Sequence, residues 1–292
     1  MTTGFFDDFT LEFIDTPFGK IRARIGGSGF PVLLLHGHPR THTTWYQVAP
    51  ILAEQFTVVC ADLPGFGQSY QPSSLEGSSG KAKAKALSAC MEALGNKHFG
   101  VAGHDRGAYR AFRLAMDLPG SVAGLVVMDG VPIFEVLERA DWQFARDWWH
   151  WFFFAQSEKA LAAIRSDPEL WYPSDGARGV DNCADYLSAT RDQSVIRGML
   201  ADYQAGLAFD YYDDRDDKEI GRRLNCPLGV LWSAQDDMVR LYGDPAEPWA
   251  QWSDAIIMKS DIPSGHHMAE EAPEAVADRL RSFFEMVSSA QG

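Results

Sequence analysis

The chain has 292 residues, of which 46% are hydrophobic and 23% charged, and its formal net charge at pH 7 is −14. This composition supports a packed core and excludes a chain that is disordered along most of its length. The strong negative charge excludes nucleic acid and anionic membrane surfaces as partners, so we expect a small-molecule substrate. An anionic substrate would then need a locally positive pocket.

The N-terminal residues lack a basic stretch followed by an apolar run, so no signal peptide is predicted. No apolar run is long enough to span a membrane. The four cysteines are scattered, without a Cys-x-x-Cys pair or a histidine at metal-ligand spacing. We therefore expect a cytoplasmic protein with no metal and no organic cofactor. The sequence leaves open whether the chain forms a homodimer.

Short strands alternate with helices along the first 130 residues. Alternating polar and apolar residues predict an opening hairpin, and short apolar runs predict buried parallel strands. The predicted hairpin strands are 9–15 and 20–25, the later strands are 31–35, 56–61, 99–102 and 122–128, and the helices are 45–52, a segment ending at 87–94, and 108–118.

The second half of the chain first loses and then regains this strand pattern. Residues 134–217 are helical and rich in aromatic residues, strands resume at 227–232 and 256–262, and an amphipathic helix covers 274–287. The alternation is typical of an α/β fold with a mostly parallel twisted sheet and helices on both faces. We predict a core domain from residues 1–133 and 218–292, with residues 134–217 inserted after the sixth strand as a helical lid.

The sequence Gly103-His104-Asp105-Arg106-Gly107 follows a predicted strand and opens a helix. Its two glycines fit a nucleophile elbow, a sharp turn that presents one side chain above the sheet edge. A carboxylate in this place is suited to displacing a leaving group from saturated carbon, which gives an alkyl-enzyme ester for water to hydrolyse. The motif therefore predicts cleavage of a carbon–halogen or epoxide bond rather than acyl transfer. The alternative interpretation is an ordinary turn with a solvated acid.

A histidine and an acid are needed to activate the water. His266 directly follows Gly265 in the loop after the last predicted strand, the usual place of the general base in this architecture, and His267 is expected to have a packing role. Asp129 and Asp236 each follow a strand and could orient the imidazole. We prefer Asp129 and keep Asp236 as the alternative.

The segment His36-Gly37-His38-Pro39 follows a predicted strand and matches a loop that donates a backbone N–H to an oxyanion hole. The second donor in this motif is the residue after the nucleophile. The predicted oxyanion donors are therefore the backbone amides of His38 and Arg106.

Six motifs extend these observations over nearly the whole chain. They are residues 36–45, 62–69, 103–108, 150–153, 202–205 and 265–266. In these motifs the chain resembles the haloacetate dehalogenases of the α/β-hydrolase fold, which include fluoroacetate dehalogenases. The resemblance implies that Asp105 is the nucleophile, His266 the base and Asp129 its acid, and that short 2-halocarboxylates are hydrolysed to the 2-hydroxy acid and halide.

The same resemblance implies roles in substrate binding. Arg106 would bind the substrate carboxylate, and the N–H and O–H groups of His150, Trp151 and Tyr203 would hold the departing halide. The family usually has a second arginine four residues after the nucleophile, where this chain has Tyr109. Arg110 is a candidate substitute, although a shift of one residue turns a helical side chain by about 100°.

Two further functions compete with this prediction. An epoxide hydrolase uses the same Asp–His–Asp groups with two lid tyrosines, here Tyr203 and one of Tyr186, Tyr211 and Tyr212. Arg106 beside the nucleophile argues against it, because an uncharged epoxide has no use for a buried cation. A ligand-binding relative with little catalytic activity is the other alternative.

Overall fold

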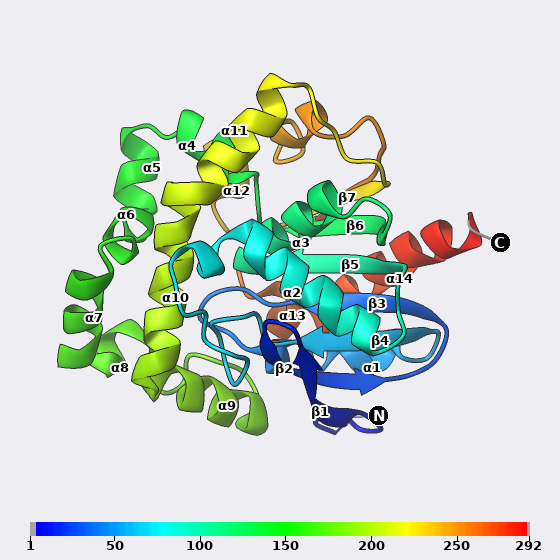
Figure 1. The fold of residues 1–292 in the computed structure, drawn as a ribbon, viewed down its shortest axis with the longest axis horizontal. Helices are drawn as coiled ribbons and strands as arrows, with labels where there is room; N and C mark the ends of the chain where they lie inside the picture. Colours follow the sequence, from blue (N-terminus) through cyan, green and yellow to red (C-terminus); the bar gives the residue numbers. More distant parts are fainter. Residues whose placement is uncertain (1–3, 291–292) are drawn as a thin grey trace.

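The computed structural model describes residues 4–290, and within them eight strands form one twisted sheet (Figure 1). The strand order is β1-β2-β4-β3-β5-β6-β7-β8, with β2 antiparallel to β1 and β4 and the other neighbours parallel. The strands are β1 (Thr10–Thr16), β2 (Gly19–Gly26), β3 (Phe30–Leu35), β4 (Phe56–Ala61), β5 (Phe99–His104), β6 (Val122–Met128), β7 (Leu228–Ser233) and β8 (Ile256–Ile262). The predicted α/β class is confirmed.

The central strands are buried on both faces, as their continuous apolar runs predict. Every residue of β5 and β6 is buried, whereas burial alternates along the edge strand β8. Hydrophobic side chains are buried on both faces of these strands, which stabilises the strands. The strands in turn hold the loops that follow β3, β5, β6 and β7 in place.

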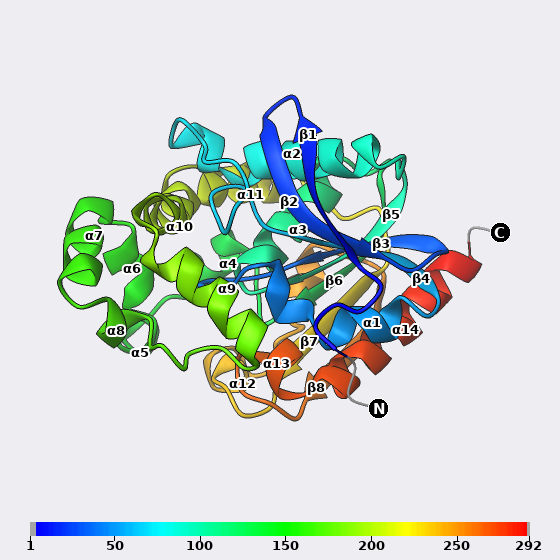
Figure 2. The same ribbon diagram turned by 90° about the horizontal axis from the view of Figure 1, so that it is seen from below.

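Helices cover both faces of the sheet (Figure 2). On one face lie α2 (Gly80–Ala93) and α3 (Arg106–Asp117), and on the other α1 (Val48–Leu52) and α14 (Pro273–Ser289). The single helix predicted over 45–52 is wrong, because the chain forms the 3₁₀ turn η1 (His42–Trp45) and then α1. Pro50 has no backbone N–H and interrupts a continuous α-helical ladder there. The remaining short helices of the core are η2 (Glu76–Ser78), α12 (Met238–Tyr242), η4 (Pro248–Gln251) and α13 (Met268–Glu271).

Between β6 and β7 the chain forms a series of helices joined by turns and loops, and we call the part from α4 to α11 the cap. Its helices are α4 (Ile133–Glu138), α5 (Trp142–Asp147), α6 (His150–Phe154), α7 (Ser157–Ser166), α8 (Pro168–Trp171), α9 (Val180–Arg191), α10 (Gln193–Ala205), the π-helix η3 (Gly206–Asp210) and α11 (Tyr211–Glu219). The helices α5 to α9 lie to one side of the sheet in both views (Figures 1 and 2). Aromatic and aliphatic side chains together form the hydrophobic cluster of the cap, which also includes Tyr109 of the core helix α3.

Among residues 4–290, no helix combines the length and the apolar character that crossing a membrane requires.

Candidate active site

Asp105 occupies a sharp turn between β5 and α3. Its backbone has φ 51° and ψ −118°, a left-handed conformation that residues other than glycine seldom adopt. A Cβ on Gly103 would overlap the carbonyl oxygen of Gly107, so the turn requires glycine at position 103. This strand–turn–helix geometry is that of a nucleophile elbow.

Backbone amides stabilise the Asp105 carboxylate. The N–H of His38, in the loop after β3, donates to Asp105 Oδ1 over 2.6 Å. The backbone amide of Arg106 also favours the ionised carboxylate. The structure thus brings both predicted oxyanion donors to Asp105, where they would stabilise negative charge on an oxygen bonded to its Cγ.

His266 lies between Asp105 and two further acids. Its Nε2 is 3.9 Å from Asp105 Oδ2, and its Nδ1 is 3.2 Å from Asp129 Oδ2 and 3.0 Å from Asp236 Oδ2. The 3.9 Å separation is too long for a hydrogen bond, so Asp105 Oδ2 is not tied to the imidazole. From the sequence, Asp129 and Asp236 are alternative partners for the histidine. In the structure both carboxylates lie within hydrogen-bond distance of His266 Nδ1.

The neighbour of His266 in sequence has a different environment. His267 lines the same pocket, its backbone N–H donates to Glu271, and burial lowers the pKa of its ring well below the usual value. The structure therefore pairs His266, rather than His267, with the candidate nucleophile and acids.

The site is electrostatically coupled. Burial raises the pKa of the Asp105 carboxyl, an effect that His266, Arg106 and the two backbone amides oppose. Burial alone would favour a neutral His266, but the hydrogen bonds to Asp129 and Asp236, together with the charge of Asp105, hold the His266 pKa well above its usual value. Esterification of Asp105 would remove one of these negative charges and lower the His266 pKa, so that more of the imidazole is neutral and able to accept a proton from water.

A pocket of about 310 Å³ lies above Asp105, between the core and the cap. The core contributes His38, Asp105, Asp236 and His266 to its lining. The cap contributes side chains from α6 and α10, so the two parts of the chain enclose the candidate nucleophile together.

The cap supplies three hydrogen-bond donors to this pocket, His150 and Trp151 from α6 and Tyr203 from α10. Among the described residues, none accepts a hydrogen bond from the Trp151 indole or the Tyr203 hydroxyl, and none bonds the His150 ring. Burial and the charges of His266 and Arg106 lower the pKa of His150 to about 4, so its ring is neutral at pH 7. Burial raises the pKa of Tyr203 well above its usual value, which keeps the phenol protonated.

Arg106 lies directly behind the pocket wall and is almost fully buried. The Tyr203 ring covers its guanidinium at 4.4 Å and the Trp151 ring at 5.3 Å. Its Nε donates to the Asp202 carboxylate over 2.5 Å and its Nη2 to the Asp202 carbonyl over 3.0 Å. Within the described part of the chain, Nη1 has no hydrogen-bond partner, and Arg106 itself is not among the residues that line the pocket.

Arg110 does not substitute for the family's second arginine, which corrects the expectation that it binds the substrate carboxylate. Its guanidinium donates to Asp210 over 2.5 Å and to Asp202 over 3.2 Å, and it does not line the pocket above Asp105. Tyr109, at the preceding position, contacts Trp151 at 5.8 Å and Arg106 at 5.1 Å between ring centroids or to the guanidinium, and it does not line the pocket either. The turn of about 100° between successive helical residues explains this difference.

Sequence reasoning missed a buried ionic cluster beneath the pocket. Asp202 on α10 pairs with Lys83 of α2 as well as with Arg106 and Arg110 of α3, and all of these side chains are at most 1% exposed. One signal was present, because Lys83 falls on the apolar face of its helix, four residues before the buried Leu87. The partner of Lys83 is distant in sequence, so only the structure identifies it.

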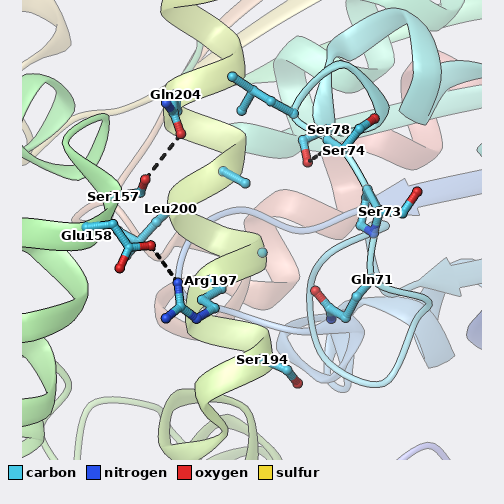
Figure 3. A pocket seen from close by; sticks show the side chains of 14 residues that line it. Gln71, Ser73, Ser74, Ser78, Ser157, Glu158, Ser194, Arg197, Leu200 and Gln204 are labelled. Atoms are coloured by element: carbon cyan, nitrogen blue, oxygen red, sulfur yellow. Dashed lines mark hydrogen bonds and ion pairs between the residues drawn. The ribbon is translucent and has the colours of Figure 1, made fainter.

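A larger cavity, of about 580 Å³, lies on another side of α10 (Figure 3). Serine and glutamine side chains line much of it, Ser157 bonds Gln204 over 3.2 Å, and Arg197 pairs with Glu158 over 2.7 Å. None of the predicted catalytic residues lines this cavity, so it is not the candidate active site.

Within residues 4–290, one group of potential metal ligands lies close together, formed by His104, Asp129 and His266. In this group the Nδ1 of His266 already lies at hydrogen-bond distance from Asp129 and Asp236. We interpret the group as a hydrogen-bonded acid–base pair and assign no metal to it.

Comparisons with known proteins agree with this geometry. A family model described as "alpha/beta hydrolase fold" matches residues 31–273. A fluoroacetate dehalogenase from Burkholderia sp is 34% identical over 95% of this chain and 94% of its own length. A soluble epoxide hydrolase from Corynebacterium sp. (strain C12) is 28% identical over 88% of this chain and 91% of its own length.

A solved structure is also similar over its whole length. A candidate epoxide hydrolase from Pseudomonas aeruginosa superposes with a TM-score of 0.92 at 35% identity, and the match covers 99% of each chain.

Proposed function

The chain belongs to the α/β hydrolase fold family, and we propose that within this family it is a hydrolytic dehalogenase of short 2-halocarboxylates. Asp105 displaces the halide from saturated carbon and forms an alkyl-enzyme ester. Water activated by His266 then hydrolyses the ester to the 2-hydroxy acid. The reaction consumes the organic halide and water and yields the 2-hydroxy acid, halide and a proton.

In the first step the attacking atom is Asp105 Oδ2. The other carboxylate oxygen accepts the His38 N–H over 2.6 Å, whereas Oδ2 is 3.9 Å from His266 and free of a hydrogen bond to it. As the carbon–halogen bond breaks, the leaving halide gains negative charge. The unpartnered donors of Trp151 and Tyr203 line the same pocket and would stabilise that charge, together with an N–H of neutral His150.

In the second step water attacks Cγ of Asp105. His266 Nε2 takes a proton from this water and returns it to the departing alkoxide oxygen, while Nδ1 stays hydrogen bonded to an acid. The His38 and Arg106 amides hold the negative oxygen of the tetrahedral intermediate. Breaking of the Cγ–O bond releases the 2-hydroxy acid and regenerates Asp105, whose extra proton passes to solvent.

The observation that carries this proposal is the convergence of an aspartate elbow, its histidine and three free donors on one pocket. A serine in the elbow would instead favour acyl transfer. For the substrate carboxylate we propose Arg106 Nη1 as the donor, since Asp202 already accepts hydrogen bonds from Nε and Nη2 along the other edge of the guanidinium.

Halide release from fluoroacetate, chloroacetate and bromoacetate tests the proposal. We expect release with the wild-type chain and none with Asp105→Asn, with circular dichroism showing that the variant is folded. No release from any of the three acids by the folded wild-type chain would refute the haloacetate assignment.

A second candidate function, epoxide hydrolysis, has support in the pairing of Arg106 with Asp202, which offsets the positive charge a carboxylate would seek. However, of the lid tyrosines considered from the sequence, Tyr203 alone lines the pocket. The Tyr211 hydroxyl donates to Glu138, Tyr212 is 48% exposed, and the Tyr186 ring packs on Arg40. Turnover of styrene oxide without halide release would favour this candidate, and binding of haloacids without turnover of either class would favour a ligand-binding relative.

A further inference from the structure

Two acids from different loops contact one nitrogen of His266. Asp129 follows β6 and Asp236 follows β7, and their Oδ2 atoms are 3.2 and 3.0 Å from Nδ1. A catalytic histidine needs only one such acid to fix its tautomer and to stabilise the imidazolium. The second carboxylate is therefore additional to the arrangement that the proposed reaction requires.

The two acids are held in different ways. Asp129 is 1% exposed, its Oδ1 accepts the Ser233 backbone N–H over 2.8 Å, and its Oδ2 accepts the Ser233 hydroxyl over 2.6 Å. The Asp236 side chain is 28% exposed and lines the pocket. Asp129 is thus fixed in the core of the molecule, whereas Asp236 belongs to the pocket lining.

We propose that Asp129 and Asp236 are both positioning residues for His266, so that either carboxylate alone keeps Nδ1 protonated and Nε2 free to accept a proton from water. This inference rests on the proposed function, because the step concerned is hydrolysis of the Asp105 ester. When Nε2 takes the proton from water, the imidazolium lies between two carboxylates, and when Nε2 returns it to the alkoxide oxygen the pair is restored. No group other than the water, the ester and His266 exchanges a proton in this step.

Other titratable groups surround the imidazole and affect its protonation. Asp105 lies on the Nε2 side at 3.9 Å, the His104 ring centroid is 4.8 Å away and that of His267 is 5.4 Å away. His150 in the cap and Asp237 beside Asp236 also interact with it electrostatically. Both Asp129 and Asp236 favour the charged imidazole. Removing either one lowers the His266 pKa and moves the pH dependence of ester hydrolysis to lower pH.

The test follows decay of the alkyl-enzyme after a single turnover with bromoacetate, by mass spectrometry of the quenched protein. The variants are Asp129→Ala, Asp236→Ala and the double variant. Alanine is chosen because an asparagine amide could donate to Nδ1 and impose the wrong tautomer. Asp237→Ala is the matched control, since it removes a charge from the same loop without contacting Nδ1.

We expect each single variant to slow decay by less than about tenfold and the double variant by about 10²- to 10⁴-fold, because only the double variant leaves Nδ1 without an acid. The midpoint of the pH profile of decay should fall by about one unit in Asp236→Ala and by less in the control. This shift is measurable even if Asp129→Ala fails to fold, because Asp236 is in the surface-accessible pocket lining.

An Asp236→Ala variant with the wild-type decay rate and pH profile would overturn the inference and leave the proposed function intact, as would a double variant no slower than Asp129→Ala. If an alkyl-enzyme forms neither on the folded wild-type chain nor on the His266→Gln variant, the proposed function fails and this inference fails with it.

Discussion

Replacing Asp202 by asparagine removes the one acid that Lys83, Arg106 and Arg110 share. All four side chains are at most 1% exposed, so the cations cannot recover hydration when the negative charge is lost. Removing one partner from a buried ion pair typically costs about 3–5 kcal/mol. We expect a loss of this size in the free energy of unfolding, and a Tm lower by about 6–12 °C.

The loss should depend on pH in a defined direction. Burial lowers the pKa of Lys83 to about 8 even with Asp202 beside it, and without Asp202 that pKa falls further. At pH 9 Lys83 is largely neutral in the folded wild type and needs its partner less. At pH 6 the Lys83 of the variant is either charged and buried without its acid or loses its proton on folding, and both cost free energy. The variant should therefore lose more stability at pH 6 than at pH 9.

Urea unfolding at both pH values measures this effect. Asp213→Asn is the matched control, because Asp213 of α11 pairs with Lys81, also on α2, at a partly exposed position, and its loss should cost less than about 1 kcal/mol. An Asp202→Asn variant no less stable than Asp213→Asn at pH 6 would refute this account of the cluster.

Three further variants test other parts of the molecule. Burial raises the pKa of Asp214 to about 7, above its unfolded value, although Arg113 Nη1 donates to this carboxylate over 3.2 Å. Wild-type stability should therefore fall as pH rises from about 4 to 7, and urea unfolding should show Asp214→Asn to be less destabilised, relative to the wild type, at pH 8 than at pH 4. Tyr203→Phe removes one proposed halide donor and should lower kcat by about 100-fold for fluoroacetate and less for bromoacetate in halide-release assays, whereas equal losses would contradict a leaving-group role. Gly103→Ala places a Cβ against the Gly107 carbonyl, so the elbow should distort and halide release should vanish, and normal activity would show that the turn tolerates a side chain.

The strands could be predicted from the sequence because their signals are local. The run Phe56–Ala61 and the run Ile256–Ile262 begin and end at the predicted residues. The elbow was equally visible, since Asp105 between glycines after an apolar strand is a local pattern. These features depend on neighbouring residues and not on contacts across the fold.

The ion pairs and hydrogen bonds that position the side chains of the site depend on tertiary structure, so they could not be predicted from local sequence patterns. The pairing of Lys83 with Asp202 joins residues 119 positions apart, and no periodicity encodes it. Asp129 and Asp236 looked like alternatives because their loops are separate in sequence, yet adjacent parallel strands bring both to His266. The ion pairs of Arg110 are equally non-local, because its partners Asp202 and Asp210 lie 92 and 100 positions away along the chain.

The formation of an ester at Asp105 is the central claim, and a single turnover of bromoacetate in H₂¹⁸O with excess enzyme tests it most directly. Water attacks Cγ of Asp105 in the second step, so we predict one ¹⁸O atom in the Asp105 peptide and none in the first-turnover glycolate. Label in the glycolate with an unlabelled Asp105 would show that water attacks the substrate directly and would contradict the account.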